Sequence, residues 1–475
     1  MRLNSISIGR YSVNTKYTYL YIPFLIILIC NLIWPPSQLM ITDEISYYFQ
    51  LQNWLHGNTQ STIVDAVSGT THSLIEGHYP PGTSFILSIL YWIHSPLIYF
   101  SGLMYLLVSI FLLYKCLRKL KLPIISLSAI YLFLPLLFIA RTTMSEMPSL
   151  LLVSIGAYLY LVNNAKYYFW LAFIAGLSVA FRETNILLLA PLAFFISKNY
   201  VLSAIAFLAG LSFRFIGYYI LTNSPLLIKE GYPFGIEFLP DTFIVYAIVL
   251  LILLPLSPLW FTKVPRLHLL PFTIGLLSFL GLHLVYGYVA SVYSGYTNGV
   301  ILNGRFWIPA LPIFVVALGY FVSSKSILKE SWIAVPVVAI IVLTNLSVHH
   351  RSSQKQSDYI QFSKILKSTS KDQLTFIDLN SRTPIFRYIY PFATDRKWSD
   401  INFVNDSQHI SQAFEKYGTF QVAILSSEST IAQSNRNTQF NSILIQLKEK
   451  HCVANINELC LNGNYCLNIY EVKQQ

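Results

Sequence analysis

Charged residues are scarce in this sequence. Asp, Glu, Lys and Arg make up only 11% of its 475 residues, whereas soluble domains carry roughly 25%. No charged side chain occurs from Tyr17 to Thr42, and hydrophobic residues reach 54% of the whole chain. This composition excludes a soluble globular protein and predicts a polytopic α-helical membrane protein.

Cysteine is also rare, with five in the chain. Cys30 and Cys116 lie in or beside apolar runs, where cysteine is a small packing residue. The other three, Cys452, Cys460 and Cys466, lie near the C-terminus. In an oxidising compartment they allow one disulfide with one thiol left over, and three unpaired buried residues are an equally good interpretation.

The few charges are unevenly distributed. Residues 351–475 hold nearly half of them, although they make up about a quarter of the chain. We therefore predict a membrane domain over residues 1–348, with a first external loop at 41–95, and a soluble domain over residues 349–475. Runs typical of strands at 374–379, 401–405, 420–425 and 466–472 alternate with helical patterns at 409–418 and 440–451. This alternation predicts an α/β domain.

Apolar runs of about 17 to 25 residues can cross a bilayer core that is about 30 Å thick. The sequence offers about eleven, of which those near 167 and 186 are short. They lie near 18–40, 96–115, 123–140, 147–163, 167–181, 186–197, 200–221, 242–261, 268–290, 306–322 and 331–348.

Lysine and arginine in short loops indicate the orientation. If the N-terminus is cytoplasmic, so are the basic segment 115–121, Lys198 and Lys263. The opposite side then receives residues 41–95, 141–146, 181–185, 291–305 and the C-terminal domain. The net charge of +11 is thus explained largely by topology and requires no nucleic acid.

Two motifs lie in the first external loop. Asp43 and Glu44 open the segment DEISYYFQLQNWLHG, whose apolar residues recur at helical spacing. Acidic residues suit the first turn of a helix, so a helix start is one interpretation and a reactive carboxylate is the other. The second motif is GHYPPGTSF at 77–85, in which the prolines and glycine predict a fixed turn and leave His78 and Tyr79 unexplained.

Three further candidates lie on the same predicted side. Glu146, in TTMSEMPSLLL, either begins a helix or joins Asp43 as a ligand of a hard divalent cation such as Mg²⁺ or Mn²⁺. Arg182, in FRETN, and Arg305, in NGRFWIPALP, adjoin apolar runs. Arginine there indicates phosphate binding, snorkelling to the interface or an ion pair with Glu183 or another carboxylate.

The order of these motifs resembles that of the GT-C glycosyltransferases, which use polyprenyl-phosphate sugars. DE, HYPPG, SE, RET and GRFWIPALP follow one another over residues 15–325. Within the class, the sequence is most similar to the bacterial branch related to protein O-mannosyltransferases and the lipid A aminoarabinose transferase. The resemblance implies a bacterial inner-membrane protein of GT-C fold with an extra-cytoplasmic C-terminal domain.

The resemblance also implies a mechanism. Asp43 would be the general base that deprotonates an acceptor hydroxyl, and transfer would invert the anomeric centre. Glu44 would orient the acceptor or sugar, and Glu146 would bind a metal or a sugar hydroxyl. Arg182 and Arg305 would stabilise the departing phosphate, with His78 and Tyr79 lining the same site.

The partners implied are the lipid bilayer, a polyprenyl-phosphate sugar and a lipid, glycan or protein acceptor. A transporter or flippase of lipid or glycan is the alternative from another class. Against it, the sequence shows no inverted repeat, and its acidic candidates lie in loops rather than within spans. A transferase that uses a lipid diphosphate-linked glycan is a further alternative, with a different donor.

Overall fold

A computed structural model of the chain contains two compact units. The first comprises residues 1–39, 50–58 and 77–353, and the second comprises residues 40–49, 59–76 and 354–475. The structure describes residues 7–8, 11–12, 15–36, 42–56, 62–64, 71–73, 79–163, 167–222, 234–287, 302–324, 331–369, 375–378, 402–404, 415, 419–427, 452–461 and 465–473.

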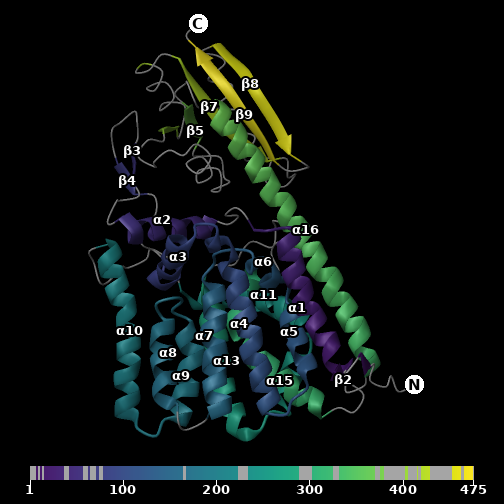
Figure 1. The fold of residues 1–475 in the computed structure, drawn as a ribbon. Coiled ribbons are helices and arrows are strands. Elements are labelled where there is room, and N and C mark those ends of the chain that lie inside the picture. The colour runs from purple at the N-terminus through teal and green to yellow at the C-terminus, as the bar shows by residue number, and fades with distance from the viewer. Residues whose placement is uncertain are drawn as a thin grey trace. The chain divides into compact units, whose positions relative to one another are not determined.

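The first unit is a bundle of apolar helices (Figure 1). Among the described residues, five helical segments are long and apolar enough to cross a membrane: Leu97–Lys119, Tyr200–Thr222, Ile236–Leu253, Arg266–Leu284 and Leu302–Ser323. Shorter apolar helices accompany them, so the chain is a multi-pass membrane protein. The predicted number of about eleven spans stays a prediction.

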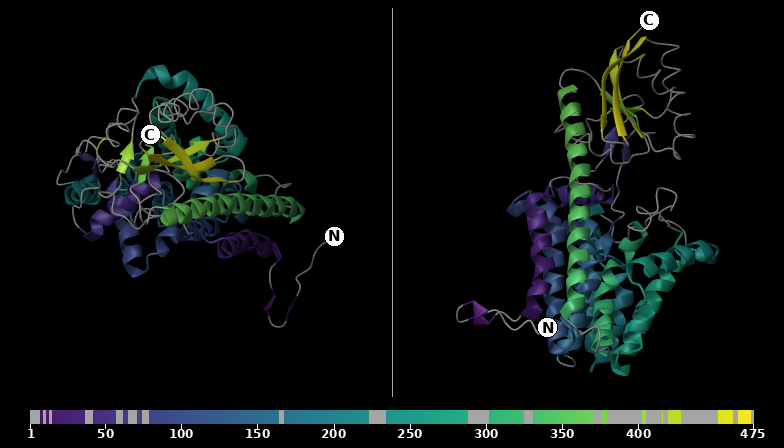
Figure 2. Two further views of the ribbon diagram at one scale, coloured as in Figure 1. Left: turned by 90° about the horizontal axis from the view of Figure 1, so that it is seen from above. Right: turned by 90° about the vertical axis from the view of Figure 1, so that its right-hand side faces the viewer.

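Most predicted spans correspond to helices of the bundle. These are α1 (Thr15–Ile33), α4 (Leu97–Lys119), α7 (Glu146–Asn163), α8 (Tyr168–Ser178), α9 (Asn185–Ile196), α10 (Tyr200–Thr222), α11 (Leu239–Leu253), α13 (Arg266–Leu284), α15 (Leu311–Ser323) and α16 (Ser331–Thr369). Helix α16 continues without a break well beyond the predicted span at 331–348, and it is the long green helix of Figure 2.

Three predicted spans differ in detail from the structure. Residues 123–140 form the short helices η1 (Ile124–Leu127), α5 (Ser128–Tyr131) and α6 (Leu134–Ile139). Pro135 contributes to this break because it lacks the N–H that a continuous helix needs. Residues 242–261 are divided between α11 and the separate helix α12 (Ser257–Phe261), and α15 is preceded by a 3₁₀ helix, η5 (Arg305–Ala310).

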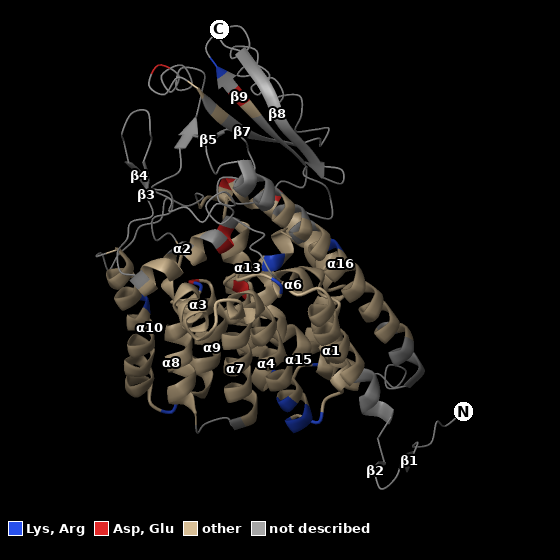
Figure 3. Cartoon of the chain, turned by 45° about the horizontal axis from the view of Figure 1, so that its top comes forward, with Lys and Arg blue, Asp and Glu red and all other residues tan. Residues whose placement is uncertain are grey.

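Charge is unevenly distributed between the two ends of the bundle. In Figure 3 the lower ends of the helices carry lysine and arginine without acidic residues, whereas the upper ends carry both acidic and basic residues. Basic lower ends, seen among the described residues, are the pattern expected when those ends face the cytoplasm.

Glycine brings helices α8 and α10 into backbone contact. A Cβ atom on Gly176 would lie 2.0 Å from the carbonyl oxygen of Phe207, and one on Gly210 would lie 2.2 Å from that of Phe173. Small residues at such a crossing let membrane helices approach closely. Helix α10 is therefore held firmly along α8, its neighbour in Figure 1.

A buried arginine joins α1 and α16 to the turn before α7. The Arg141 side chain donates from Nε to Ser352 Oγ at 3.1 Å, from Nη1 to Asn31 Oδ1 at 3.2 Å and from Nη2 to the Trp34 carbonyl at 2.7 Å. It is 1% exposed, and burial lowers its pKa to about 10. The group therefore stays charged at neutral pH and cross-links three segments.

We expect Arg141→Met to destabilise the bundle. Each acceptor that is left buried without a donor costs about 1–3 kcal/mol, and removal of the buried charge offsets only part of this. The measurement is the thermal midpoint of the purified protein in detergent, with exposed Arg266→Met as the control. A midpoint for Arg141→Met at or above that of the unaltered protein would contradict the assigned role.

The second unit contains a five-stranded sheet with the order β6-β5-β7-β9-β8. Strands β6 (Asn402–Val404), β5 (Thr375–Asp378) and β7 (Phe420–Ser427) are parallel, whereas β9 (Tyr465–Lys473) and β8 (Cys452–Leu461) continue the sheet antiparallel. The four predicted strands correspond to β5, β6, β7 and β9, and β8 was missed. The predicted helices at 409–418 and 440–451 lie largely or wholly outside the described residues.

The register of strands β8 and β9 places two cysteines opposite each other. Cys460 lies directly opposite Cys466. Directly opposite Cα atoms in such a ladder are about 4.5–5.5 Å apart, which a disulfide can span. Of the pairs that the sequence leaves open, the backbone thus favours Cys460 with Cys466. The unit also includes a hairpin of β3 (Thr62–Val64) and β4 (Thr71–Ser73).

Candidate functional site

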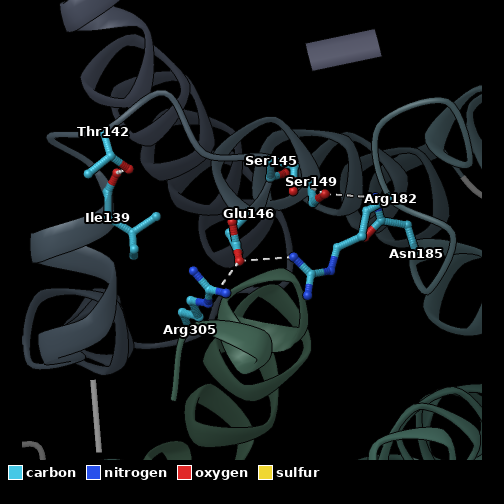
Figure 4. A network of polar contacts seen from close by, with 8 residues as sticks. All are labelled: Ile139, Thr142, Ser145, Glu146, Ser149, Arg182, Asn185 and Arg305. Carbon is cyan, nitrogen blue, oxygen red and sulfur yellow. Dashed lines mark hydrogen bonds and ion pairs between the residues drawn. The ribbon is translucent and has the colours of Figure 1, made fainter. Parts of the chain in front are cut away.

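Two of the predicted arginines approach the same carboxylate oxygen of the predicted residue Glu146 (Figure 4). Arg182 Nη1 lies 3.0 Å from Glu146 Oε1, and Arg305 Nε lies 3.6 Å from the same oxygen. The residues come from the start of α7, the turn between α8 and α9, and the start of η5. We refer to Glu146, Arg182 and Arg305 as the arginine–carboxylate cluster.

Local structure explains how each member reaches the cluster. Glu146 is the first residue of α7, where the helix dipole favours a negative charge. Arg182 belongs to a turn whose following residue Asn185 donates from Nδ2 to Ser149 Oγ at 2.9 Å. Since Ser149 lies nearly one turn after Glu146, this bond aligns the Arg182 turn with the start of α7.

The cluster is buried and consists of two guanidinium groups and one carboxylate. The exposed fractions of the side chains are 1% for Glu146, 9% for Arg305 and 14% for Arg182. Both guanidinium groups also lie 5.1 Å from the centre of the Phe306 ring, which supports them through cation–π contacts. Within the cluster, two guanidinium groups thus share one carboxylate and one aromatic ring.

The buried atoms Glu146 Oε2 and Arg182 Nε have no hydrogen bond among the described residues. Buried polar groups normally have partners, and an N–H and a carboxylate oxygen together match a ligand with both acceptor and donor groups. A phosphorylated sugar has this chemistry.

The predicted turn around HYPPG contacts the segment that carries Arg182. The Gly82 N–H donates to the Ala180 carbonyl at 2.6 Å, and a Cβ atom on Gly82 would lie 2.7 Å from that oxygen. Helix α3 (Pro81–Ile93) begins at this contact. The glycine therefore serves a close approach between two motifs that are about a hundred residues apart in sequence.

The remaining predicted site residues come from the first external loop and are not members of the arginine–carboxylate cluster. Helix α2 (Thr42–His56) confirms the expected helix, with Asp43 and Glu44 in its first turn; Asp43 is half-buried and Glu44 is 1% exposed. Both residues belong to the second unit. Tyr79 is half-buried, and its carbonyl accepts a hydrogen bond from Gln50 Nε2 at 2.8 Å. His78 lies outside the described residues.

The surroundings of Glu146 fit a divalent cation poorly. Its Oε1 atom already faces two guanidinium groups, which would repel Mg²⁺ or Mn²⁺. Within the part of the chain that the structure describes, no group of three or more His, Cys, Asp and Glu side chains could hold a metal. We derive no step through a metal, and the prediction of a metal shared with Asp43 stays a prediction.

The sequence interpretation missed several residues around the cluster. Phe306 directly follows Arg305 in a motif that was recognised, yet nothing in its spacing indicates a ring between two arginines. Arg214 gave a clearer signal, because it is the sole charged residue of α10. His283 is 3% exposed, and the centre of its ring lies 5.6 Å from that of Phe306. No feature of the sequence around His283 indicated this position.

Comparison with known proteins gives one clear result. No protein-family model and no curated protein matches the sequence significantly. Among solved structures, the crystal structure of ArnT from Cupriavidus metallidurans bound to undecaprenyl phosphate matches 97% of this chain and 98% of its own, with a TM-score of 0.55. The chain has the fold of ArnT. The apo structure of ArnT matches 96% and 97% of the two chains, with a TM-score of 0.56.

The likeness to ArnT is one of fold, since the sequence identity is 10% for the bound and 9% for the apo structure. ArnT is a GT-C enzyme, the lipid A aminoarabinose transferase. The resemblance inferred from the order of the motifs is therefore confirmed, and the membrane part has a polytopic helical GT-C fold.

Proposed function

We propose that this protein is a membrane glycosyltransferase that moves a sugar from a polyprenyl phosphate to an acceptor hydroxyl. The observation that carries the proposal is the buried cluster of two arginines on one carboxylate, in the fold of a protein crystallised with undecaprenyl phosphate. A transferase of this kind requires such a site, because the group it releases is a lipid phosphate.

The donor phosphate binds to Arg182 and Arg305 in this proposal. Both guanidinium groups lie beside the Glu146 carboxylate, and the buried Arg182 Nε has no hydrogen-bond acceptor among the described residues. Arginine offers phosphate a planar fork of donors, and its attraction is strong where water is excluded. Glu146 keeps the two guanidinium groups together and offers Oε2 to a sugar hydroxyl.

The reaction is a single displacement at the anomeric carbon. The acceptor oxygen forms a bond to that carbon while the bond from carbon to phosphate oxygen breaks, which inverts the configuration. Asp43 takes the acceptor proton, and the polyprenyl phosphate leaves with the bonding electron pair. Arg182 and Arg305 stabilise the charge that grows on the phosphate. Glu44 orients the acceptor or sugar, and His78 and Tyr79 line the same site.

The predicted sidedness places this reaction on the non-cytoplasmic face of a bacterial inner membrane. The acceptor is a lipid, a glycan or a protein exposed on that face. The basic lower ends of the helices in Figure 3 support this orientation.

The test is sugar transfer by the purified protein. It is supplied with synthetic polyprenyl-phosphate sugars and with envelope material from cells that lack the gene, and mass spectrometry follows glycosylated products and released polyprenyl phosphate. We expect a new glycosidic bond and one polyprenyl phosphate for each sugar transferred. Movement of intact donor across vesicle membranes without such a bond would instead establish a transporter, and use of a diphosphate-linked donor alone would overturn the proposed donor class.

A further inference from the structure

Neighbouring residues of the Arg182 turn make ion pairs in different places. Arg182 contacts Glu146 of the cluster, whereas Glu183 Oε1 lies 2.6 Å from Nη2 of Arg214 on α10. Glu183 is the carboxylate nearest to Arg182 in the sequence, but in the structure it pairs with an arginine of another helix. Two ion pairs, one from Arg182 to Glu146 and one from Glu183 to Arg214, therefore fix the turn.

Among the described residues, Arg214 makes three contacts, two of which are with the Arg182 turn. Besides Glu183, its Nη1 donates to the Val179 carbonyl at 3.2 Å, and its guanidinium lies 5.2 Å from the centre of the Tyr218 ring on its own helix. Arg214 lies roughly 12 Å before the end of α10 at Thr222, given 1.5 Å per residue. A charge within such an apolar helix is costly and therefore indicates a function.

Helix α10 is a firm support for these contacts. Gly210, which holds α10 against α8, and Gly217, where a Cβ atom would lie 2.6 Å from Pro81, flank Arg214 by four and three residues. Positions three and four apart share one face of a helix. The same face of α10 therefore packs on α8, binds the Arg182 turn and contacts the start of α3.

Stability alone is a poor explanation for the ion pair. The Glu183 side chain is 52% exposed and that of Arg214 is 18% exposed. Exposed ion pairs contribute little to the free energy of unfolding because water screens them and side-chain entropy is lost. What this pair does specify is the conformation of the turn that carries Arg182.

We propose that Arg214 and Glu183 form a positioning pair that aims Arg182 at the donor phosphate. The inference rests on the proposed function, because it assumes that Arg182 binds that phosphate. Without the pair, the turn between α8 and α9 loses its anchor to α10, and Arg182 samples orientations that do not reach the ligand. Neither Arg214 nor Glu183 touches the donor.

The experiment measures transfer kinetics of the full-length protein for Arg214→Met, Glu183→Gln, the double variant and the charge-swapped pair Glu183→Arg with Arg214→Glu. We expect each single change to lower kcat/KM for the lipid donor roughly tenfold, the double variant to be no worse, and the swap to recover part of the loss. The KM for the acceptor should not change. Exposed Arg266→Met is the control, and thermal midpoints are recorded for all variants.

A cycle with Arg182→Met separates positioning from a merely structural role. If Arg214 acts through Arg182, then Arg214→Met has no further effect on the lipid donor once Arg182 is Met. Independent, additive losses overturn the inference, as does unchanged donor kinetics for Arg214→Met while Arg182→Met is impaired. Normal donor kinetics for Arg182→Met overturns the phosphate assignment as well, so the two failures are distinguishable.

Discussion

Asp43→Asn is expected to abolish sugar transfer while leaving membrane insertion intact. Asparagine has nearly the shape of aspartate but cannot accept the proton of an attacking hydroxyl, and general-base catalysis contributes about 10²–10⁴-fold to rate. Since Asp43 lies in the first turn of helix α2, the substitution should cost little in folding. The measurement is the rate of transfer from a polyprenyl-phosphate sugar, with the amount of inserted protein determined in the same membranes.

The competing interpretation of Asp43 makes a different prediction. A residue that only begins a helix stabilises it by about 0.3–1 kcal/mol through the helix dipole. Asp43→Asn would then lower the thermal midpoint slightly and leave transfer near normal. Such a result with well-inserted protein would remove Asp43 as the base. Glu44→Gln provides a comparison in the same helical turn, and it should impair acceptor or sugar use rather than eliminate proton transfer.

Arg305→Ala is expected to reduce kcat/KM for the lipid donor by about 10²–10³-fold, the cost of removing one donor that stabilises developing negative charge. The guanidinium is buried beside Glu146 and over the Phe306 ring, so water cannot readily replace it. Arg305→Lys should recover only part of the loss, because lysine keeps the charge but lacks the planar fork. Steady-state kinetics against donor concentration give the result.

The control for Arg305 is another arginine of the same chain. Arg266, at the start of α13, is exposed and lies on the predicted cytoplasmic side. Arg266→Ala should leave both donor and acceptor kinetics unchanged. If Arg305→Ala, in folded protein, also left the kinetics toward the lipid donor unchanged, Arg305 would not bind the phosphate.

Much of the membrane architecture follows from the sequence because bilayer thickness imposes a length on each apolar run. Helices α4, α10 and α13 lie close to their predicted ranges. Residues 123–140 met the same length criterion and yet form three short helices. Hydropathy measures only whether a segment prefers an apolar environment, and it does not register a break that packed neighbours can accommodate.

In the C-terminal domain too, the sequence predicted some elements and missed another. Strands β5, β6, β7 and β9 were predicted from runs typical of strands, whereas β8, with the sequence CVANINELCL, was not recognised. It forms a strand because it pairs with β9 along most of its length. Cross-strand pairing between distant segments is a tertiary effect, so propensity within the segment does not predict it.

The sequence by itself determined the class of protein and the candidates for its chemistry. Composition required a membrane, basic loops indicated an orientation, and Glu146, Arg182 and Arg305 stood out as charges beside apolar runs. Only the tertiary structure decided their partners. Arg182 contacts Glu146 rather than its neighbour Glu183, which contacts Arg214. Side-chain direction in a turn depends on the backbone and on packing from other helices, and neither is encoded in adjacency along the chain.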